Sequence, residues 1–403
     1  MRRNELDYLL GTLLEFNKEV SDILFTVDKP PQVEAAGVLV PVPTNPPLDR
    51  LSPFQTETIA LNLVAGSSRL TEDLIASGSC DLSYSLPGRA RFRVNVFQQR
   101  GCYSIVLRKL NAQIPTLADL SLPEIVLQAA KEKTGLVLVT GATGSGKTST
   151  LAALLDEINA RSAIHIITLE DPVEFVYTQK KATINQREMG TDFDNYSTGL
   201  RAALRQAPKL ILVGEMRDRA TVEIALSAAE TGHLVFSTLH TIDAGQTINR
   251  ILGMFETEEQ EQVRYRLADT LRWVFSQRLA PRVGGGRFPI LEVMGASLRT
   301  KESITLGESE GKSFYEIIEA SQPFGWRTFD YSCLEAFRKG TITEETAELF
   351  CSKRGVVTRG IDMLKKSRGE ATTDISDLKM IPLASPGSAG AKPPPVPLNV
   401  KFK

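Results

Sequence analysis

The chain has 403 residues, of which 42% are hydrophobic, and this predicts two or three domains with sizeable cores. Its formal net charge of −1 argues against a global attraction to nucleic acid or to an anionic membrane. The four cysteines are far apart and form no C-x-x-C pair, which excludes a tetracysteine zinc site. No apolar run approaches the ~18 residues that cross a bilayer. A reducing, cytoplasmic location is therefore expected.

Residues 1–112 have the pattern of a small α+β domain. Leucines at helical spacing predict an opening helix over residues 6–14, and further helices are expected near 52–65 and 71–77. Strands are predicted where apolar and polar residues alternate or β-branched residues gather, at 22–27, 37–42, 81–85, 91–97 and 104–108. The segment 111–122 follows as an expected interdomain linker.

Residues 113–366 alternate between strand and helix patterns, which predicts a parallel sheet covered by helices on both faces. Residues 256–278 read as one long helical pattern, although its end overlaps a possible strand at 276–280. Residues 367–403 are rich in Pro, Gly and Ser without periodicity, and we expect this tail to be disordered. The predicted strands of the sheet are 136–140, 163–169, 210–214 and 234–239, with helices near 123–133, 198–206, 220–229 and from 244.

Residues 141–148 read GATGSGKT and match the phosphate-binding pattern G-x-x-x-x-G-K-[ST]. An apolar strand precedes the motif and a helix follows it, which disfavours the alternative of a chance glycine turn. Backbone N–H groups and the helix dipole are expected to hold phosphates, Lys147 to reach the β- and γ-phosphates, and Thr148 to bind Mg²⁺. The predicted nucleotide-binding residues are Gly141, Thr143, Gly144, Ser145, Gly146, Lys147, Thr148 and Ser149.

Carboxylates follow two of the predicted strands, at the sheet edge where parallel sheets bind ligands. Glu170 and Asp171 end one apolar strand, and Glu215 follows another after a glycine. We expect Glu170 to orient Mg²⁺ and Glu215 to be the catalytic carboxylate that positions the attacking water. The candidate magnesium ligands are therefore Thr148, Glu170 and Glu215. The alternative for each carboxylate is a solvated strand end.

Two of the three histidines bracket the strand predicted at 234–239. His240 lies at the carboxyl end and is expected near the phosphates, whereas His233 lies at the opposite end and is the weaker candidate on strand geometry. His165 sits early in a buried strand, where a structural role is expected.

Arg93 and Arg108 lie on two predicted strands of the first domain. An arginine finger can neutralise the charge that develops during phosphoryl transfer. Sequence spacing does not show that these arginines reach the P-loop, so a solvated basic hairpin stays open as the alternative.

Together these motifs resemble the secretion-superfamily ATPases, and most closely the PilT-like type IV pilus retraction (twitching motility) ATPases. The resemblance extends over about residues 5–365. It is carried by the Walker A, Asp-box, Walker B and His-box segments at 136–151, 167–175, 210–218 and 228–241. Characteristic stretches are AETGHLVF at 229–236, TLHT at 238–241, RQAP at 205–208, SDILF at 21–25 and SFYEII at 313–318.

The resemblance implies an α/β fold with a PAS-like N-terminal domain, a RecA-like P-loop ATPase domain and a helical C-terminal segment. It implies a homohexameric ring that uses ATP and Mg²⁺, with nucleotides between subunits and domains. Arg93 and Arg108 fall on the family's arginine-finger positions, Glu170 on its Asp-box position, Glu215 on its catalytic position, and His233 and His240 on its His-box pair.

By the same resemblance, the expected partner is an inner-membrane pilus platform protein, with a paralogous pilus ATPase as a further candidate and no nucleic acid. The expected location is cytoplasmic, peripheral at the inner-membrane face. One segment departs from the pattern: residues 299–308 read RTKESITLGE, where retraction ATPases carry an Ala-Ile-Arg-Asn-Leu-Ile-Arg-Glu-type motif. The missing Cys-x-x-Cys pairs argue against the extension and type II secretion branch.

Three functions therefore remain open. The leading one is a hexameric ATP-hydrolysing motor at the base of a type IV pilus that powers retraction. The alternatives are an accessory, nucleotide-gated ring subunit or the ATPase of a related type II/IV secretion system. A nucleic-acid translocase is disfavoured by the neutral charge and the lack of a basic tract.

Overall fold

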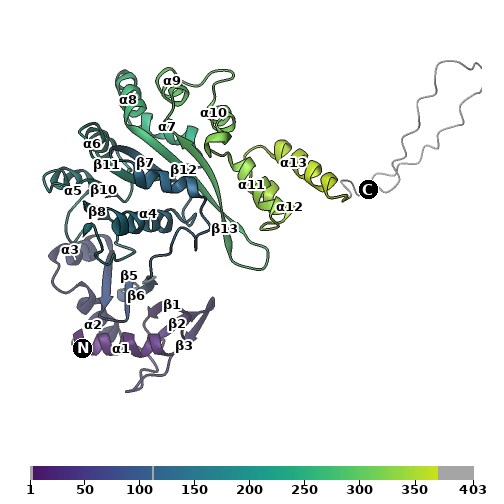
Figure 1. Ribbon diagram of the computed structural model, residues 1–403. Helices are drawn as coiled ribbons and strands as arrows, with labels where there is room; N and C mark the ends of the chain where they lie inside the picture. Colours follow the sequence, from purple (N-terminus) through teal and green to yellow (C-terminus); the bar gives the residue numbers. More distant parts are fainter. Residues whose placement is uncertain (1–2, 111–112, 371–403) are drawn as a thin grey trace, which may run out of the picture.

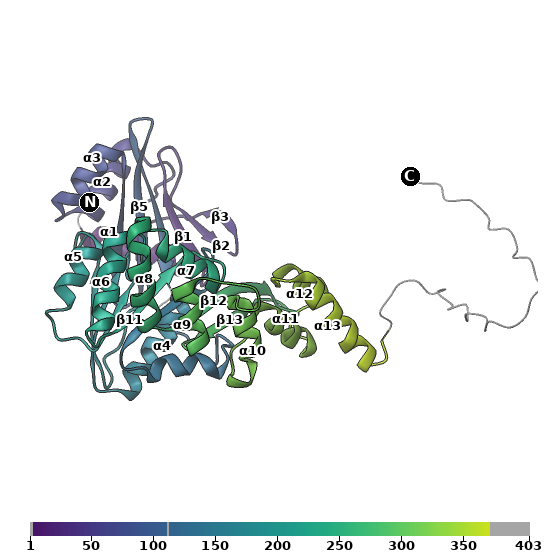
Figure 2. The same cartoon turned by 90° about the horizontal axis from the view of Figure 1, so that it is seen from above.

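The computed structural model describes residues 3–110 and 113–370, so most of the predicted disordered tail lies outside the described residues. Figure 1 shows the N-terminal sheet with α1, α2 and α3, a larger second sheet, and a helical extension that carries α11–α13 away from the N-terminal end; Figure 2 shows the extension from above. The described part of the chain is thus a mixed α/β structure with two sheets.

The N-terminal sheet has the strand order β3-β2-β1-β6-β5-β4, with every neighbouring pair antiparallel. The strands are β1 (Val20–Phe25), β2 (Gln32–Ala35), β3 (Val38–Pro41), β4 (Ser79–Leu86), β5 (Ala90–Gln99) and β6 (Cys102–Leu110). The helices are α1 (Arg3–Glu15), α2 (Pro53–Val64) and α3 (Ser68–Ser77). Buried leucines of α1 pack with alternate residues of the strands, such as Phe92 and Val94 of β5, into one core.

The second sheet has the strand order β13-β12-β7-β11-β10-β8-β9 and is parallel except for the β12–β13 pair. The strands are β7 (Gly135–Thr140), β8 (His165–Glu170), β9 (Thr183–Glu188), β10 (Leu210–Val213), β11 (Leu234–Leu239), β12 (Leu271–Pro281) and β13 (Arg287–Gly295). The first helices around it are a 3-10 helix η1 (Glu124–Lys131), α4 (Lys147–Arg161), α5 (Tyr196–Ala203), α6 (Arg219–Glu230), α7 (Ala244–Leu252) and α8 (Thr257–Thr270).

Helices cover both faces of this sheet, as the alternation of strands and helices predicted. One face packs against α4 through a core that includes Val137 and Ile166. The other face packs against α5, α6 and α8 through a core that includes Leu138 and Ile167. The C-terminal elements are α9 (Leu298–Leu306), α10 (Phe314–Ala320), a 3-10 helix η2 (Gln322–Phe324), α11 (Phe329–Arg338), α12 (Glu344–Phe350) and α13 (Arg354–Ser367).

Local structure differs from the sequence predictions at three places. The long helix predicted over 256–278 ends at Thr270, because the chain turns extended at Leu271 and continues as β12, whose Val274 and Phe275 are buried beside β7. The expected helix near 123–133 is a 3-10 helix. Strand β9 was missed because it is an edge strand made mostly of polar residues, with Ile184 as its one large apolar side chain.

Candidate nucleotide-binding site

A cavity of about 870 Å³ lies at the carboxyl ends of the parallel strands and reaches the N-terminal sheet. This volume is in the range of small-molecule and cofactor pockets. It brings together most of the predicted site residues, namely Arg93, Thr143, Gly144, Gly146, Lys147, Thr148, Ser149, Glu170, Glu215 and His240. Gly141 and Ser145 line a smaller neighbouring cavity of about 440 Å³, which shares Thr143 and Gly144 with the first.

The P-loop folds tightly because its glycines adopt conformations that other residues resist. Gly141 has φ +145°, and a Cβ there would meet the carbonyl oxygen of Gln277 at 2.4 Å. Gly146 has φ +91° and forms the N-cap of α4 without a side-chain hydrogen bond. The first N–H groups of α4 are therefore left for a ligand, and the helix dipole favours an anion there.

Lys147 is buried in this loop and directs its ammonium group toward the loop's own carbonyl oxygens. Its Nζ donates to Gly141 O at 2.8 Å and to Ala142 O at 3.0 Å. Burial lowers the pKa of Lys147, partly opposed by the nearby Glu174 carboxylate. The two carbonyl oxygens are neutral acceptors for the Lys147 ammonium group. A phosphate in the loop would give this group an anionic partner, which binds it more strongly.

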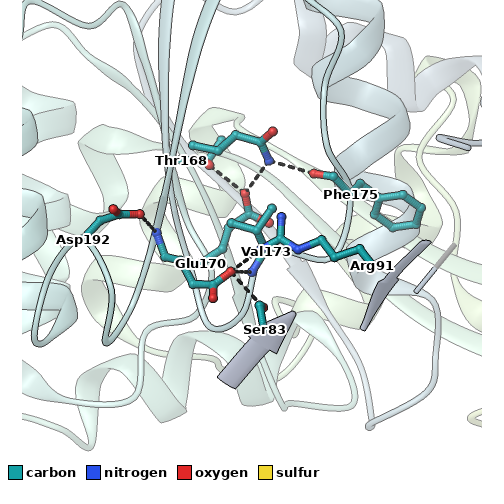
Figure 3. A network of polar contacts seen from close by, with 9 residues as sticks. Ser83, Arg91, Thr168, Glu170, Val173, Phe175 and Asp192 are labelled. Carbon is teal, nitrogen blue, oxygen red and sulfur yellow. Dashed lines mark hydrogen bonds and ion pairs between the residues drawn. The ribbon is translucent and has the colours of Figure 1, made fainter. Parts of the chain in front are cut away.

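Glu170 ends β8 as a buried carboxylate held by two side chains (Figure 3). Its Oε1 accepts hydrogen bonds from Thr168 Oγ1 at 2.6 Å and from Gln186 Nε2 at 3.1 Å. Burial raises the pKa of Glu170 to about 7, and the two hydrogen bonds act against this rise. A cation beside it would restore the charged form, because an opposite charge favours the ionised carboxylate.

Magnesium fits this site only as an ion shared with the nucleotide. Among the described residues no group of three or more His, Cys, Asp or Glu side chains is placed to hold a metal ion. Mg²⁺ is commonly held by one or two protein oxygens together with phosphates and water. The Thr148 hydroxyl and the carboxylates of Glu170 and Glu215, which line the same cavity, are oxygen donors of that kind.

Glu215 follows β10, and each of its carboxylate oxygens contacts a different side chain, one of Arg217 and one of His240. It is 8% exposed, its Oε1 pairs with Arg217 Nε, and its Oε2 lies 3.1 Å from His240 Nε2. His240 follows β11, the neighbouring strand, so strand order alone brings the two side chains together. Burial, with the charges of Lys147 and Arg217, lowers the pKa of His240, so the ring is neutral near pH 7.

The two predicted finger arginines are cross-strand partners, Arg93 on β5 and Arg108 on β6. Arg93 lines the cavity, and it is the part of the N-terminal sheet that reaches the site. Arg108 does not line it; its Nε pairs with Asp22 Oδ1 at 2.9 Å and its side chain is 71% exposed. One chain therefore brings only the first of the pair to the nucleotide cavity.

The remaining histidines lie away from the cavity within one chain. His233 precedes β11, and its Nδ1 lies 3.1 Å from Ala228 O at the opposite end of the strand. His165 begins β8, where its Nδ1 lies 2.9 Å from Gln206 O and its Nε2 lies 2.9 Å from Asn185 Nδ2. These contacts agree with the structural role expected for His165.

Sequence reasoning missed several residues of the cavity wall. Gln277 of β12 accepts from Thr150 Oγ1 at 2.8 Å and lies against the P-loop glycines; the possible strand at 276–280 contained it, but nothing in the sequence placed that strand beside the P-loop. Arg217 was visible two residues after Glu215, yet no spacing rule pointed to it. Asp119 comes from the expected linker and Arg287 from the hairpin of β12 and β13.

Residues 78–294 match the family model described as Type II/IV secretion system protein. The chain is similar to the type IV pilus retraction ATPase PilT of Pseudomonas aeruginosa, with 39% identity over 83% of this chain and 96% of that protein. It is also similar to the type IV pilus ATPase PilU of the same organism, with 36% identity over 85% of this chain and 87% of that protein.

Solved structures give the same picture. The pilus retraction motor PilT with bound ADP is similar with a TM-score of 0.76 and 39% identity, over 88% of this chain and 98% of that chain. The ATPase DotB of Legionella pneumophila is similar with a TM-score of 0.76 and 28% identity, over 87% and 95%. Within the part of the chain that the structure describes, no helix is both long and apolar enough to cross a membrane.

Proposed function

The chain belongs to the type II/IV secretion system protein family, as a PilT-like ATPase, and on that premise we propose that its cavity hydrolyses ATP to drive pilus retraction. The observation that carries the proposal is one cavity in which the P-loop, Glu170, the Glu215–His240 pair and Arg93 of the other domain face one another. The bound ADP in the similar PilT structure supports an adenine nucleotide as the ligand.

Each side chain has a role that follows from its place. The P-loop amides and Lys147 bind the phosphates, and a magnesium ion, held by Thr148 and Glu170, would neutralise charge on them. Glu215 orients the attacking water and takes up its proton, with His240 holding one carboxylate oxygen in place. Arg93 approaches from the N-terminal sheet to offset the charge that develops on the transferred group.

The proposed assembly is a homohexameric ring. Arg108 and His233 are outside the cavity of their own chain, and the Arg108 side chain is largely exposed. In a ring, these two predicted site residues would lie near the nucleotide bound by a neighbouring subunit. The proposed work is done on an inner-membrane platform protein from the cytoplasmic face, with a paralogous pilus ATPase such as a PilU-like protein as a further partner.

An accessory role in the same ring system is the second candidate, and one observation favours it. Residues 299–308, which depart from the retraction motif, lie largely in α9, where Ile304 O accepts from Arg264 Nη1 of α8 at 2.9 Å. This segment is not among the residues that line the nucleotide cavity. The departure therefore leaves the residues that line the nucleotide cavity unchanged.

Steady-state ATP turnover of full-length wild type, Glu215→Gln and Glu223→Gln tests the enzyme. Glu223 is an exposed glutamate on α6 and serves as the matched control. We expect wild type and Glu223→Gln to turn over ATP and Glu215→Gln to lose at least about 100-fold in kcat. No turnover by assembled wild-type protein would contradict the ATPase proposal.

Pilus dynamics in a deletion strain separate the motor from the accessory role. Excess pili that do not retract are expected for a retraction motor. Normal retraction would instead support the accessory role or a related secretion system.

A further inference from the structure

We propose that Arg91 and Glu188 are positioning residues of this ATPase: their ion pair ties strand β5 to the loop after Glu170 and so holds Arg93 over the cavity. The inference rests on the proposed ATPase function and adds to it a contact through which the position of the N-terminal domain controls the site. We call the two residues the Arg91–Glu188 pair.

A single oxygen of Glu188 collects donors from both domains. Its Oε2 accepts from Ser83 Oγ at 3.0 Å, from Val173 N at 3.1 Å and from Arg91 Nη2. Ser83 and Arg91 belong to the β4–β5 hairpin, and Val173 belongs to the loop after Glu170 (Figure 3). The two domains are therefore joined through one carboxylate at the edge of the nucleotide site.

The pair is shielded from water, so its geometry is firmly held. The side chains of Arg91 and Glu188 are 22% and 11% exposed. Salt screens such partly buried charges weakly, and removal of one partner leaves the other buried and unpaired. The Glu188 backbone is fixed as well, because its N–H donates to Asp192 Oδ2 at 2.7 Å.

The loop after Glu170 is held at two points by strand β9. Glu188 is the register partner of Glu170, and Gln186 is the register partner of Thr168, so all four side chains leave the same face of the sheet. Glu188 binds the loop at Val173 N, and Gln186 Nε2 donates to Phe175 O at 2.7 Å. Between and beside these points, Asp171, Pro172, Glu174 and Phe175 line the cavity.

Strand geometry connects the pair to the proposed finger. Arg91 and Arg93 are two residues apart on β5 and so extend from the same face of the N-terminal sheet. With Arg91 fixed on Glu188, Arg93 is directed into the cavity. Movement of the N-terminal domain away from the cavity must break the pair, which releases the finger and leaves the Glu188 carboxylate, which binds the loop at Val173 N, without its counter-charge.

A second contact between the same two regions lies beside the pair. Gly190 follows β9, and a Cβ at this position would lie 1.8 Å from Nη2 of Arg69 on α3. The Arg69 guanidinium thus rests directly on the Gly190 backbone. The N-terminal domain therefore contacts Glu188 through its β4–β5 hairpin and Gly190 through α3.

Kinetics of full-length protein test the proposal with Arg91→Gln, Glu188→Gln, the double variant and Arg91→Lys. Arg89→Gln is the matched control, because Arg89 lies in the turn before β5 and pairs with exposed Glu15, within the N-terminal domain. We expect each single Gln variant to lose about tenfold in kcat with less than about threefold change in KM for ATP. The double variant should be no slower than the slower single variant, and Arg91→Lys should recover most of the loss.

Amide hydrogen exchange of the apo proteins gives a readout that does not depend on turnover. Peptides that contain Val173 should exchange faster in Arg91→Gln and Glu188→Gln than in Arg89→Gln, because the side chain that accepts from Val173 N loses the ion pair that fixes it. Failure of wild type to hydrolyse ATP would refute the proposed function and this positioning role alike. Active wild type with unchanged kcat in the folded variants, losses that multiply in the double variant, or unchanged exchange at Val173 would overturn the positioning role alone.

Discussion

Nε2 of His240 lies 3.1 Å from Oε2 of Glu215, and these two side chains follow neighbouring parallel strands. The pKa of His240 is lowered by burial and by nearby Lys147 and Arg217, so the neutral ring can donate one N–H to the carboxylate. Arg217 takes the other oxygen of Glu215. Glu215 is thereby held in one orientation, which suits the water-positioning role proposed for it.

The two histidines of the His-box segment therefore make a matched pair of variants. We expect His240→Asn to lower kcat by about 10- to 100-fold because Glu215 loses its partner. His233→Asn should cause a smaller loss within one site, since His233 contacts Ala228 O at the other end of β11. Steady-state ATPase assays check this order, and a larger loss for His233→Asn would show that its contribution comes through a neighbouring subunit.

Alanine substitutions at two P-loop glycines distinguish the cost of backbone strain from the cost of a steric contact. Gly144 and Gly146 both have positive φ, +78° and +91°, but only a Cβ at Gly146 meets another group, Gln277 Nε2 at 2.8 Å. We expect Gly144→Ala to destabilise the apo protein by about 1 kcal/mol through its backbone, and Gly146→Ala to cost more. Urea unfolding without nucleotide measures both, and equal losses would contradict the contact with Gln277.

Glu292 predicts a pH dependence of stability. Its Oε1 accepts from Ala244 N at 2.8 Å, and burial raises the pKa of Glu292 from 4.5 to about 7. Because the folded state favours the protonated carboxyl, this group's stabilisation is complete below pH 4.5 and is lost as the pH rises through 7. The loss from this one group amounts to up to about 3 kcal/mol.

Glu292→Gln keeps the acceptor for Ala244 N but cannot ionise. The unfolding free energy of this variant, relative to wild type, should therefore rise between pH 4.5 and 7 and level off above that range. Denaturant melts at several pH values measure the difference in unfolding free energy between the two proteins. The contributions of the other buried carboxylates are the same in both and cancel in this difference. Parallel stability curves for the two proteins would contradict the prediction.

The features that were predictable from sequence are those formed by residues that follow one another along the chain. Glu170 ends one apolar strand, and Glu215 and His240 follow two others. Parallel strands bring their carboxyl ends to one edge, so the meeting of these side chains followed from pattern alone. The P-loop was predictable for the same reason, because strand, glycines and helix are consecutive.

Contacts that depend on tertiary placement were not predictable in this way. Glu188 lies on a polar edge strand that carries no clear strand pattern, and its partner Arg91 is 97 residues away in the sequence. Gln277 fell in the possible strand at 276–280, but its place beside the P-loop depends on the pairing of β12 with β7, which the sequence does not show. The arginines needed the fold to distinguish them, since Arg93 and Arg108 differ in reach although they are register partners.

An arginine from the N-terminal domain completes the nucleotide cavity, and the kcat of full-length Arg93→Gln tests this arrangement most directly. Arg89→Gln provides the control, since Arg89 pairs with Glu15 outside the cavity. We predict at least about a 100-fold loss of kcat for Arg93→Gln with nucleotide binding retained, against less than a twofold change for the control. A kcat within twofold of wild type for folded, nucleotide-binding Arg93→Gln would contradict the claim.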